Sequence, residues 1–241
     1  MNALALFAKL PRAGEVKTRL VPPLSPHGAA ALAEAFLRDC SAALVRAADA
    51  LAAVPYVFYA PGGCGDAVRA LVGDRVHLQP QSGGDLGERL TCADRALANA
   101  AHEQLCFLGA DAPTLPLAYV LAAFAALAEG TDVALGPASD GGYYALALRG
   151  VGRNESAHLA LFARIGWSGP QVAAQTLERI AAQGLSHVVL PEWYDVDGPA
   201  ALERLRRELC GGEPALVRGD DAPATRAVLC ASDRTRALTL T

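Results

Sequence analysis

Asp111 is the acidic residue best placed for chemistry in this sequence. It follows a short apolar run, residues 105–108, and two prolines just after it prevent the chain from continuing as a strand. An apolar run bounded by glycine and proline is typical of a buried parallel strand, and open α/β sheets bind ligands outside the carboxyl ends of such strands. Asp111 is therefore either a ligand for a divalent cation that carries substrate phosphates or a cap of the helix expected at 115–129.

A loop rich in cations follows the first expected strand, residues 2–8. Its positive side chains are Lys9, Arg12, Lys17 and Arg19. A proline and Gly14 bend the loop, and glycine lets a backbone approach a ligand closely. The loop has neither the Walker spacing nor the dinucleotide G-x-G-x-x-G pattern. It is either an ordinary solvated loop or a site for an anionic phosphate chain, and its place directly after the first strand favours the phosphate site.

Two glycine-containing turns each carry one carboxylate. Gly84 precedes Asp85, which is the expected N-cap of the helix that runs to residue 101. A glycine turn that leads from a strand into a helix is also a site for an anion or a base edge. Asp140-Gly141 joins the apolar runs 132–137 and 143–148 and is a hairpin signal. The alternative is that Asp140 and its glycines line the floor of a pocket.

Asp195 and Asp197 precede the last long helix, expected at 200–209. We expect the two side chains to point to opposite faces of an extended segment, so that only one of them faces a crevice. Asp197 is a second candidate carboxylate for a cation and also a candidate N-cap of that helix.

The expected elements that position these residues alternate between strand and helix. Ser25-Pro26 predicts the start of a long helix, and strands are expected at 54–60, 76–79 and 186–190 as well. This alternation predicts an α/β fold of three layers, α/β/α, around a mostly parallel mixed sheet. We expect one domain over residues 1–210, with the tail 211–241 packed on it or extending it and containing a short helix near 223–229.

Composition excludes several classes of protein. The 241 residues are 52% hydrophobic with a mean hydropathy of +0.23, which argues against disorder. A net charge of −4 without a basic cluster argues against a nucleic-acid partner, and no apolar run is long enough to predict a membrane span. The six cysteines are scattered, without a C-x-x-C pair, and read as reduced thiols. We therefore expect a cytoplasmic enzyme. A homodimer is one state in which it could occur.

Five blocks of sequence carry a resemblance to the nucleotide-diphospho-sugar transferase superfamily, which has the GT-A fold. They are FAKLPRAGEVKTRL at 7–20, GDLGERL at 84–90, LGADAPTL at 108–115, PASDGGYY at 137–144 and YDVDGP at 194–199. Their joint occurrence in this order is more specific than any single block. Within the superfamily the chain most resembles a bacterial branch associated with arsenosugar glycosyl transfer. It also resembles the guanylyltransferases of cofactor biosynthesis, which share the first loop and the D-V-D ending.

The resemblance implies a Rossmann-like GT-A fold and a metal-dependent transferase. Mg²⁺ or Mn²⁺ would be held by Asp111 and Asp197, and the nucleotide phosphates by Lys17 and Arg19. The candidate catalytic residues are Asp111, Asp197 and Lys17. The candidate substrate-binding residues are Lys9, Arg12, Lys17, Arg19, Gly84, Asp85, Arg89, Asp140 and Gly141, of which residues 85–89 would lie near the base or ribose and 140–141 on the acceptor side.

Two positions depart from the pattern of these relatives. Gly198 stands where they often have threonine, and Ala201 where an acidic residue is frequent. Because Gly198 loosens the loop that holds Asp197, the metal role of Asp197 is less secure than that of Asp111.

Three functions follow from these expectations. The first is glycosyl transfer from a nucleoside-diphosphate sugar to a small acceptor. The second is nucleotidyl transfer from a nucleoside triphosphate to a phosphorylated acceptor with release of pyrophosphate. The third is a catalytically silent nucleotide-binding protein of the same fold. The sequence identifies no nucleotide base, sugar or acceptor, and no convincing general base, a role for which Asp140 is a candidate.

Overall fold

The computed structural model describes residues 1–167, 169–211 and 219–238, with backbone only for 232–238. Seven strands in this part of the chain form one sheet, in the order β3-β2-β1-β4-β6-β5-β7. The strands are β1 (Asn2–Lys9), β2 (Ala53–Ala60), β3 (His77–Pro80), β4 (Gln104–Gly109), β5 (Val133–Pro137), β6 (Tyr143–Arg149) and β7 (His187–Val189). Strand β6 runs antiparallel to both its neighbours, and the other pairs are parallel.

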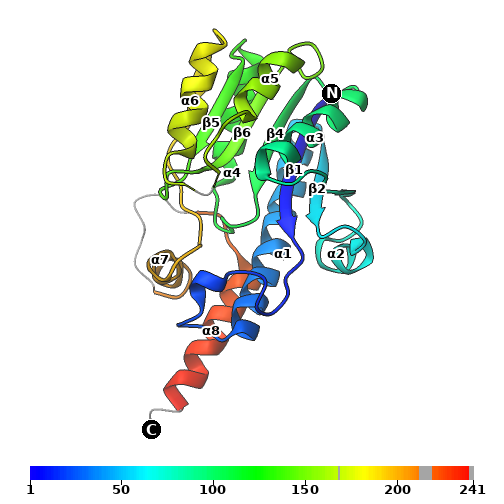
Figure 1. Ribbon diagram of the computed structural model, residues 1–241. Coiled ribbons are helices and arrows are strands. Elements are labelled where there is room, and N and C mark those ends of the chain that lie inside the picture. Colours follow the sequence, from blue (N-terminus) through cyan, green and yellow to red (C-terminus); the bar gives the residue numbers. More distant parts are fainter. Residues whose placement is uncertain (168, 212–218, 239–241) are drawn as a thin grey trace.

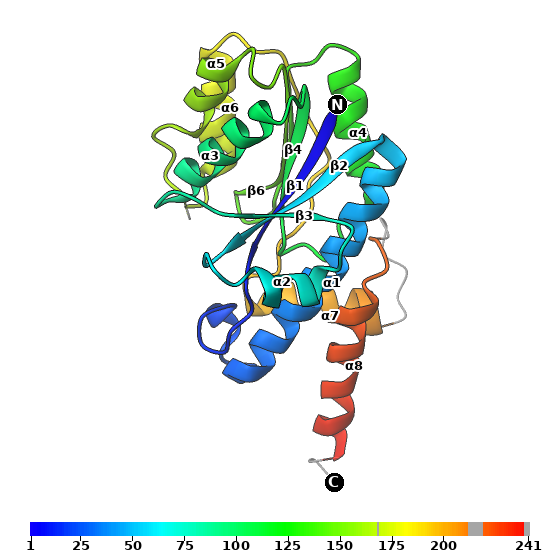
Figure 2. The same ribbon diagram turned by 90° about the vertical axis from the view of Figure 1, so that its right-hand side faces the viewer.

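Helices cover both faces of this sheet (Figures 1 and 2). They are α1 (Pro26–Leu51), α2 (Gly65–Val72), α3 (Leu86–Asn99), α4 (Leu117–Ala128), α5 (Glu155–Phe162), α6 (Val172–Ala182), α7 (Pro199–Cys210) and α8 (Pro223–Leu238), with a 3-10 turn η1 (Thr18–Leu20). The three-layer α/β/α architecture with a mostly parallel mixed sheet is therefore confirmed.

The alternation of side chains along β1 divides the interior into two cores. Leu4 and Leu6 pack into the core on the side of α1, α4 and α7, whereas Ala3 and Ala5 pack into the core on the side of α3, α5 and α6. Successive residues of a strand point to opposite faces, so a strand buried on both sides must be apolar throughout. This explains why the sequence of β1 has no polar residue between Asn2 and Lys9.

Local signals in the sequence set several helix boundaries. Ser25 caps α1 by accepting a hydrogen bond from the Gly28 amide at 3.0 Å, and Pro26 takes the first helical position, as predicted. The helix expected near 223–229 is longer and reaches Leu238. Its first turn is held by a buried carboxylate of α1, because Asp39 accepts hydrogen bonds from the amides of Ala224 and Thr225 at 3.1 and 2.8 Å. In Figures 1 and 2, α8 runs beside α1 and extends beyond the sheet. In the described residues, no helix has both the length and the apolar character that a bilayer span requires.

Asp132, which immediately precedes β5, joins three segments of the chain at the sheet and gives the fold a dependence on pH. Its carboxylate accepts hydrogen bonds from the amide and hydroxyl of Ser186, at 3.0 and 2.7 Å, and from Arg149 at 2.6 Å. Burial acts to raise the pKa of Asp132, but the hydrogen bonds from Ser186 and Arg149 outweigh it and lower this pKa below its usual 3.8. A lowered pKa stabilises the fold above about pH 4, and this stabilisation is lost as the pH falls through the value in the folded protein.

We therefore expect Asp132→Asn to lower the free energy of unfolding by about 1 kcal/mol at pH 7. The deficit should shrink below about pH 4, because the wild-type carboxylate is then protonated as well. Urea unfolding of both proteins between pH 3 and pH 7 measures it. Asp74→Asn is the matched control, since the Asp74 side chain is 97% exposed. A deficit that persists undiminished at pH 3, or that the control shares, would contradict the prediction.

Candidate functional site

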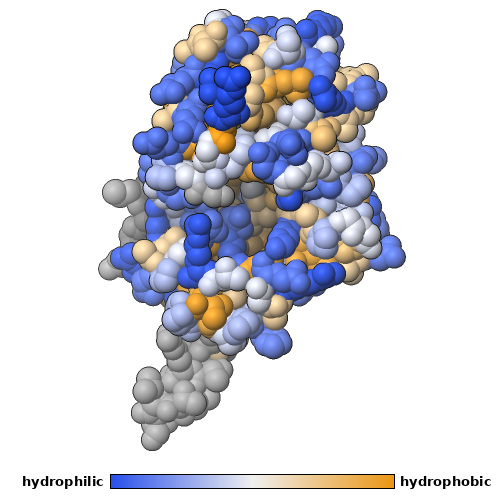
Figure 3. Space-filling model, in the orientation of Figure 1, coloured by the Kyte–Doolittle hydropathy of each residue, from blue (hydrophilic) through white to orange (hydrophobic). Residues whose placement is uncertain are grey.

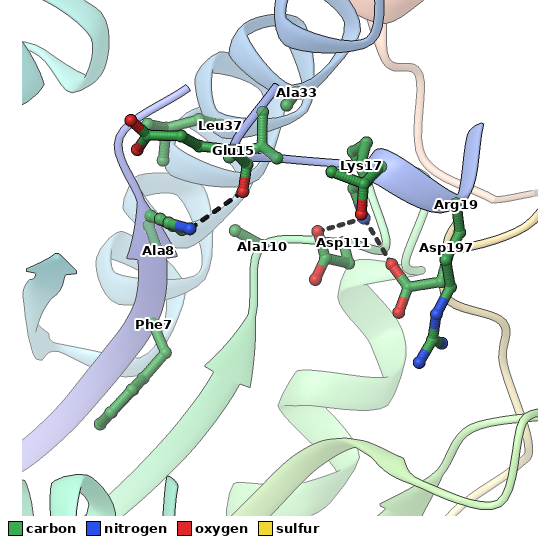
Figure 4. A pocket seen from close by; sticks show the side chains of 13 residues that line it. Phe7, Ala8, Glu15, Lys17, Arg19, Ala33, Leu37, Ala110, Asp111 and Asp197 are labelled. Carbon is green, nitrogen blue, oxygen red and sulfur yellow. Dashed lines mark hydrogen bonds and ion pairs between the residues drawn. The ribbon is translucent and has the colours of Figure 1, made fainter. Parts of the chain in front are cut away.

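A pocket of about 270 Å³ lies where β1 and β4 end, under the loop that leaves β1 (Figure 4). Figure 3 shows this face hollowed between the sheet and the half of the molecule that contains α7, with hydrophilic residues on the walls. The pocket is lined by Phe7, Ala8, Lys9, Glu15, Val16, Lys17, Thr18, Arg19, Ala33, Leu37, Ala110, Asp111 and Asp197. It therefore gathers the cationic loop and both predicted carboxylates at the carboxyl edge of the parallel strands.

Lys17 joins the two carboxylates. Its ammonium contacts Oδ1 of Asp111 and lies 2.7 Å from Oδ1 of Asp197. The Lys17 side chain is 6% exposed, whereas those of Asp111 and Asp197 are 49% and 42% exposed. Burial acts to lower the pKa of Lys17, but the two carboxylates outweigh it and the pKa is raised. Lys17 therefore stays a cation between two anions at the mouth of the pocket.

The backbone explains how segments so far apart in the sequence meet. Lys17 has a left-handed conformation with φ 48° and precedes η1, whose turn is closed by a 2.9 Å hydrogen bond from the Leu20 amide to the Lys17 carbonyl. The amide of Val196 donates to the carbonyl of Asp111 at 2.9 Å. This bond aligns the segment around Val196 with the end of β4 and brings Asp197 to the same side as Asp111.

The capping alternatives for the two carboxylates are wrong. The N-cap of α4 is Pro116, five residues after Asp111, because the prolines delay the helix. The N-cap of α7 is Gly198, and Pro199 takes the first helical position. Asp197 lies before that cap and is directed to Lys17 instead.

Asp195 belongs to the same acidic group, which the alternation argument did not reveal. It is partly buried, and its pKa is raised to about 7, first by burial and then by the charges of Asp111, Asp140 and Asp197, while Lys17 acts to lower it. Residues two apart on an extended segment point to the same face, so the expectation that Asp195 and Asp197 point apart was wrong. The D-V-D spacing itself was the signal in the sequence that Asp195 lies near Asp197, although among the described residues only Asp197 of the two lines the pocket.

The other cations of the first loop differ in whether they line the pocket. Lys9 and Arg19 line the pocket, and the Lys9 ammonium donates to the carbonyl of Glu15 at 2.9 Å, which closes the loop on itself. Arg12 is exposed and falls outside the described residues that line the pocket. The structure thus brings Lys9, Lys17 and Arg19 together and leaves Arg12 apart.

The glycine turn at residues 83–85 is held by its own side chains. Asp85 caps α3 by accepting from the Glu88 amide at 2.8 Å, which confirms the predicted cap, and the Gly84 amide donates to Glu88 at 2.7 Å. Arg89 donates to the carbonyls of Gly83 and Gly84 at 3.3 and 3.0 Å. The side chains of Asp85 and Arg89 therefore stabilise the glycine turn through hydrogen bonds to its backbone.

Gln81 is a positioning residue that no pattern in the sequence indicated. Its side-chain amide donates to the carbonyls of Ala8 and Phe58, at 3.0 and 2.8 Å, and its oxygen accepts from Arg89 at 3.3 Å. It thus fastens the glycine turn to the ends of β1 and β2, next to the pocket. A lone glutamine in a loop carries no signal of such a role before the strand order is known.

Asp140 and Gly141 form the predicted hairpin turn between β5 and β6. The Asp140 carboxylate accepts from the Gly142 amide at 2.9 Å, and the Gly141 amide donates to the Ala138 carbonyl at 3.0 Å. Both residues lie outside the described lining of the pocket, although Asp140 is near enough to raise the pKa of Asp195.

The donor set fits a hard divalent cation. Mg²⁺ is usually held by one or two carboxylates together with waters and substrate phosphates, and Asp111 and Asp197 already converge on one cation, the Lys17 ammonium. In the described part of the chain, no group of three or more His, Cys, Asp and Glu side chains has the arrangement of a metal site. An ion here would therefore need oxygens from a phosphate ligand and from water.

Comparisons with known proteins agree with this architecture. The model of the family DUF2064, described as an uncharacterized protein conserved in bacteria, matches residues 42–169. A crystal structure from Desulfovibrio desulfuricans G20, provisionally named a nucleotide-diphospho-sugar transferase, is 30% identical with a TM-score of 0.82, over 97% of this chain and 95% of that one. No curated protein matches.

More distant solved structures share the fold alone. CMP:2-keto-3-deoxy-manno-octonic acid synthetase, complexed with CTP, is 14% identical with a TM-score of 0.55, over 88% of this chain and 99% of that one. A nucleotidyl transferase from Methanothermobacter is 15% identical with a TM-score of 0.55, over 86% and 96%. The predicted superfamily resemblance is supported by the family match and by the Desulfovibrio protein, whereas the arsenosugar branch stays a prediction.

Proposed function

This chain belongs to the DUF2064 family, and from that premise we propose that it is a metal-dependent transferase that uses a nucleotide-activated donor. One observation carries the proposal: Asp111 and Asp197 converge with Lys17 in a pocket at the carboxyl ends of β1 and β4. Two carboxylates and three lining cations suit a diphosphate and a divalent ion. We propose a small-molecule acceptor, and the net charge of −4 argues against a nucleic acid in that role.

The favoured reaction is glycosyl transfer from a nucleoside-diphosphate sugar. It is supported by the 30% identity to a protein provisionally named a nucleotide-diphospho-sugar transferase. The bond between the sugar carbon and the diphosphate oxygen breaks, and the nucleoside diphosphate leaves with the electrons of that bond. The acceptor oxygen bonds to the sugar carbon, and its proton passes to solvent. A volume of about 270 Å³ suits the diphosphate and part of its substituents, so we place the rest of the donor and the acceptor on the adjoining open surface.

The chain's own residues would act on the departing diphosphate. Asp111 and Asp197 would hold a divalent ion, which when bound supplies neutralisation of the charge that develops on the departing phosphate. Lys17 and Arg19 would bind the phosphate oxygens and stabilise the same charge. Gln81 and Arg89 would keep the glycine turn in position beside the ends of β1 and β2.

Nucleotidyl transfer is the second candidate, because the shared fold occurs in a synthetase complexed with CTP and in a nucleotidyl transferase. An assay of released products separates the two reactions. The protein is incubated with Mg²⁺ or Mn²⁺ and a panel of small acceptors, either with each nucleoside-diphosphate sugar or with each nucleoside triphosphate.

We expect metal-dependent release of a nucleoside diphosphate from one sugar donor. Release of pyrophosphate from a nucleoside triphosphate would instead show that the reaction is nucleotidyl transfer and not glycosyl transfer. Metal-dependent binding of a nucleotide by calorimetry, with neither product formed, would indicate a silent binding protein of this fold.

A further inference from the structure

The Lys17 ammonium stands where a cation bridging Asp111 and Asp197 would stand. It contacts Oδ1 of Asp111 and lies 2.7 Å from Oδ1 of Asp197, and Figure 4 shows it between the two carboxylates. A Mg²⁺ ion requires oxygen ligands at about 2.0–2.1 Å. Because an ammonium and a divalent ion repel each other and would share the same two oxygens, they cannot occupy this position together.

Further contacts favour this inward position of Lys17. The ammonium lies 5.5 Å from the centre of the buried Phe36 ring, within the range of a cation–π interaction. The Lys17 side chain is 6% exposed and its ammonium pairs with two carboxylates. If the side chain moved outward without a new partner, the ammonium would lose both of these ion pairs. Its new surroundings would include Lys9 and Arg19, which line the same pocket and repel it.

We propose that Lys17 is a resident cation that competes with the divalent ion for Asp111 and Asp197, so that the metal binds well only together with a phosphate ligand. The inference rests on the proposed function. A phosphate that enters the pocket supplies the partner that Lys17 needs after it leaves the carboxylates, and a lysine side chain has the flexible stem to make that move. Metal and phosphate then favour each other's binding through one side chain, which is a positive coupling between their sites.

The test measures binding of Mn²⁺ alone, by the electron paramagnetic resonance of the free ion. Lys17→Met removes the competing cation and keeps the length of the stem, and it is expected to bind Mn²⁺ at least tenfold more tightly than the wild type. Arg19→Met is the matched control, because it removes the same charge from the same pocket. The control is expected to change the affinity less than threefold.

Inorganic pyrophosphate provides the second arm, with water-proton relaxation enhancement to detect protein-bound Mn²⁺. Pyrophosphate should tighten Mn²⁺ binding to the wild type at least tenfold and to Lys17→Met much less. Lys17→Gln repeats both arms should the methionine variant fold poorly, and thermal unfolding verifies the fold of each.

Three outcomes would overturn the inference: an unchanged Mn²⁺ affinity in the Lys17 variants, an equal gain in Arg19→Met, or a wild type that binds Mn²⁺ equally well with and without pyrophosphate. In each of these the protein still binds the metal, so the proposed function survives. A wild type and variants that bind no Mn²⁺ even with pyrophosphate would instead remove the metal-dependent function itself, and the inference with it.

Discussion

Replacing Asp111 by asparagine is expected to slow turnover of the nucleotide donor at least a hundredfold while leaving the protein folded. The Asp111 carboxylate is the first of the two proposed metal ligands and contacts Lys17. Removing one such electrostatic contact to a transition state costs about 3–4 kcal/mol, which is a factor of at least a hundred in rate. Asparagine has nearly the same shape, and the side chain is 49% exposed, so the cost to folding should be small.

The measurement is the initial rate of product release at saturating metal, with donor concentration varied. Asp49→Asn serves as the control, because Asp49 is an exposed acid of α1 that pairs only with Arg75 among the described residues and lies outside the pocket. We expect the control to keep its rate within a factor of two and both variants to unfold within about 2 °C of the wild type. An Asp111→Asn protein that retains more than a third of the rate would refute the metal-ligand assignment.

The fold could be predicted because its signals are local and repeat along the chain. Apolar runs ended by glycine or proline mark the strands, and the alternation of strand and helix predicts the layers. The strand order β3-β2-β1-β4-β6-β5-β7 could not be predicted in this way. It depends on which apolar faces cover each other, and the antiparallel β6 enters between β4 and β5 through the hairpin at Asp140-Gly141.

The sequence predicted which residues gather at the site only where they stand directly after a strand or directly before a helix. Asp111, Lys17 and Asp197 each follow a strand or precede a helix, and the rule that parallel strands end at one edge brings them together. The ion pairs between Lys17 and these two acids could not be predicted from the sequence. That Lys17 pairs with both acids depends on the left-handed turn at residue 17 and on the hydrogen bond from Val196 to Asp111.

The local capping argument failed at Asp197. The N-cap of α7 is Gly198, and the Asp197 carboxylate pairs with Lys17 instead. A charged partner 180 positions away in the sequence is absent from any local window. Gln81 and Arg89 illustrate the same point, since their hydrogen bonds join a turn to strand ends that only the folded sheet brings near.

Gly141→Ala is expected to destabilise the fold by about 3 kcal/mol, from a left-handed backbone penalty of about 1–2 kcal/mol and an overpacking cost of similar size. Gly141 has φ +91°, and a β-carbon there would overlap the carbonyl group of Pro170. That group is backbone, and the Gly141 carbonyl itself accepts from the Ala173 amide at 2.9 Å. Neither partner can move aside as a flexible side chain would.

For a chain of this size, about 3 kcal/mol corresponds to a melting temperature lower by roughly 6–12 °C, which calorimetry resolves readily. Gly109→Ala is the matched control, because no described atom beyond its own residue and its two chain neighbours lies within 4 Å of a β-carbon placed there. We expect it to shift the melting temperature by less than about 2 °C. The comparison also decides between two roles for Gly141. A variant that melts normally but loses donor turnover would show that the glycine admits a ligand, whereas low stability with a normal rate per folded molecule assigns it to the packing of the β5–β6 turn against Pro170.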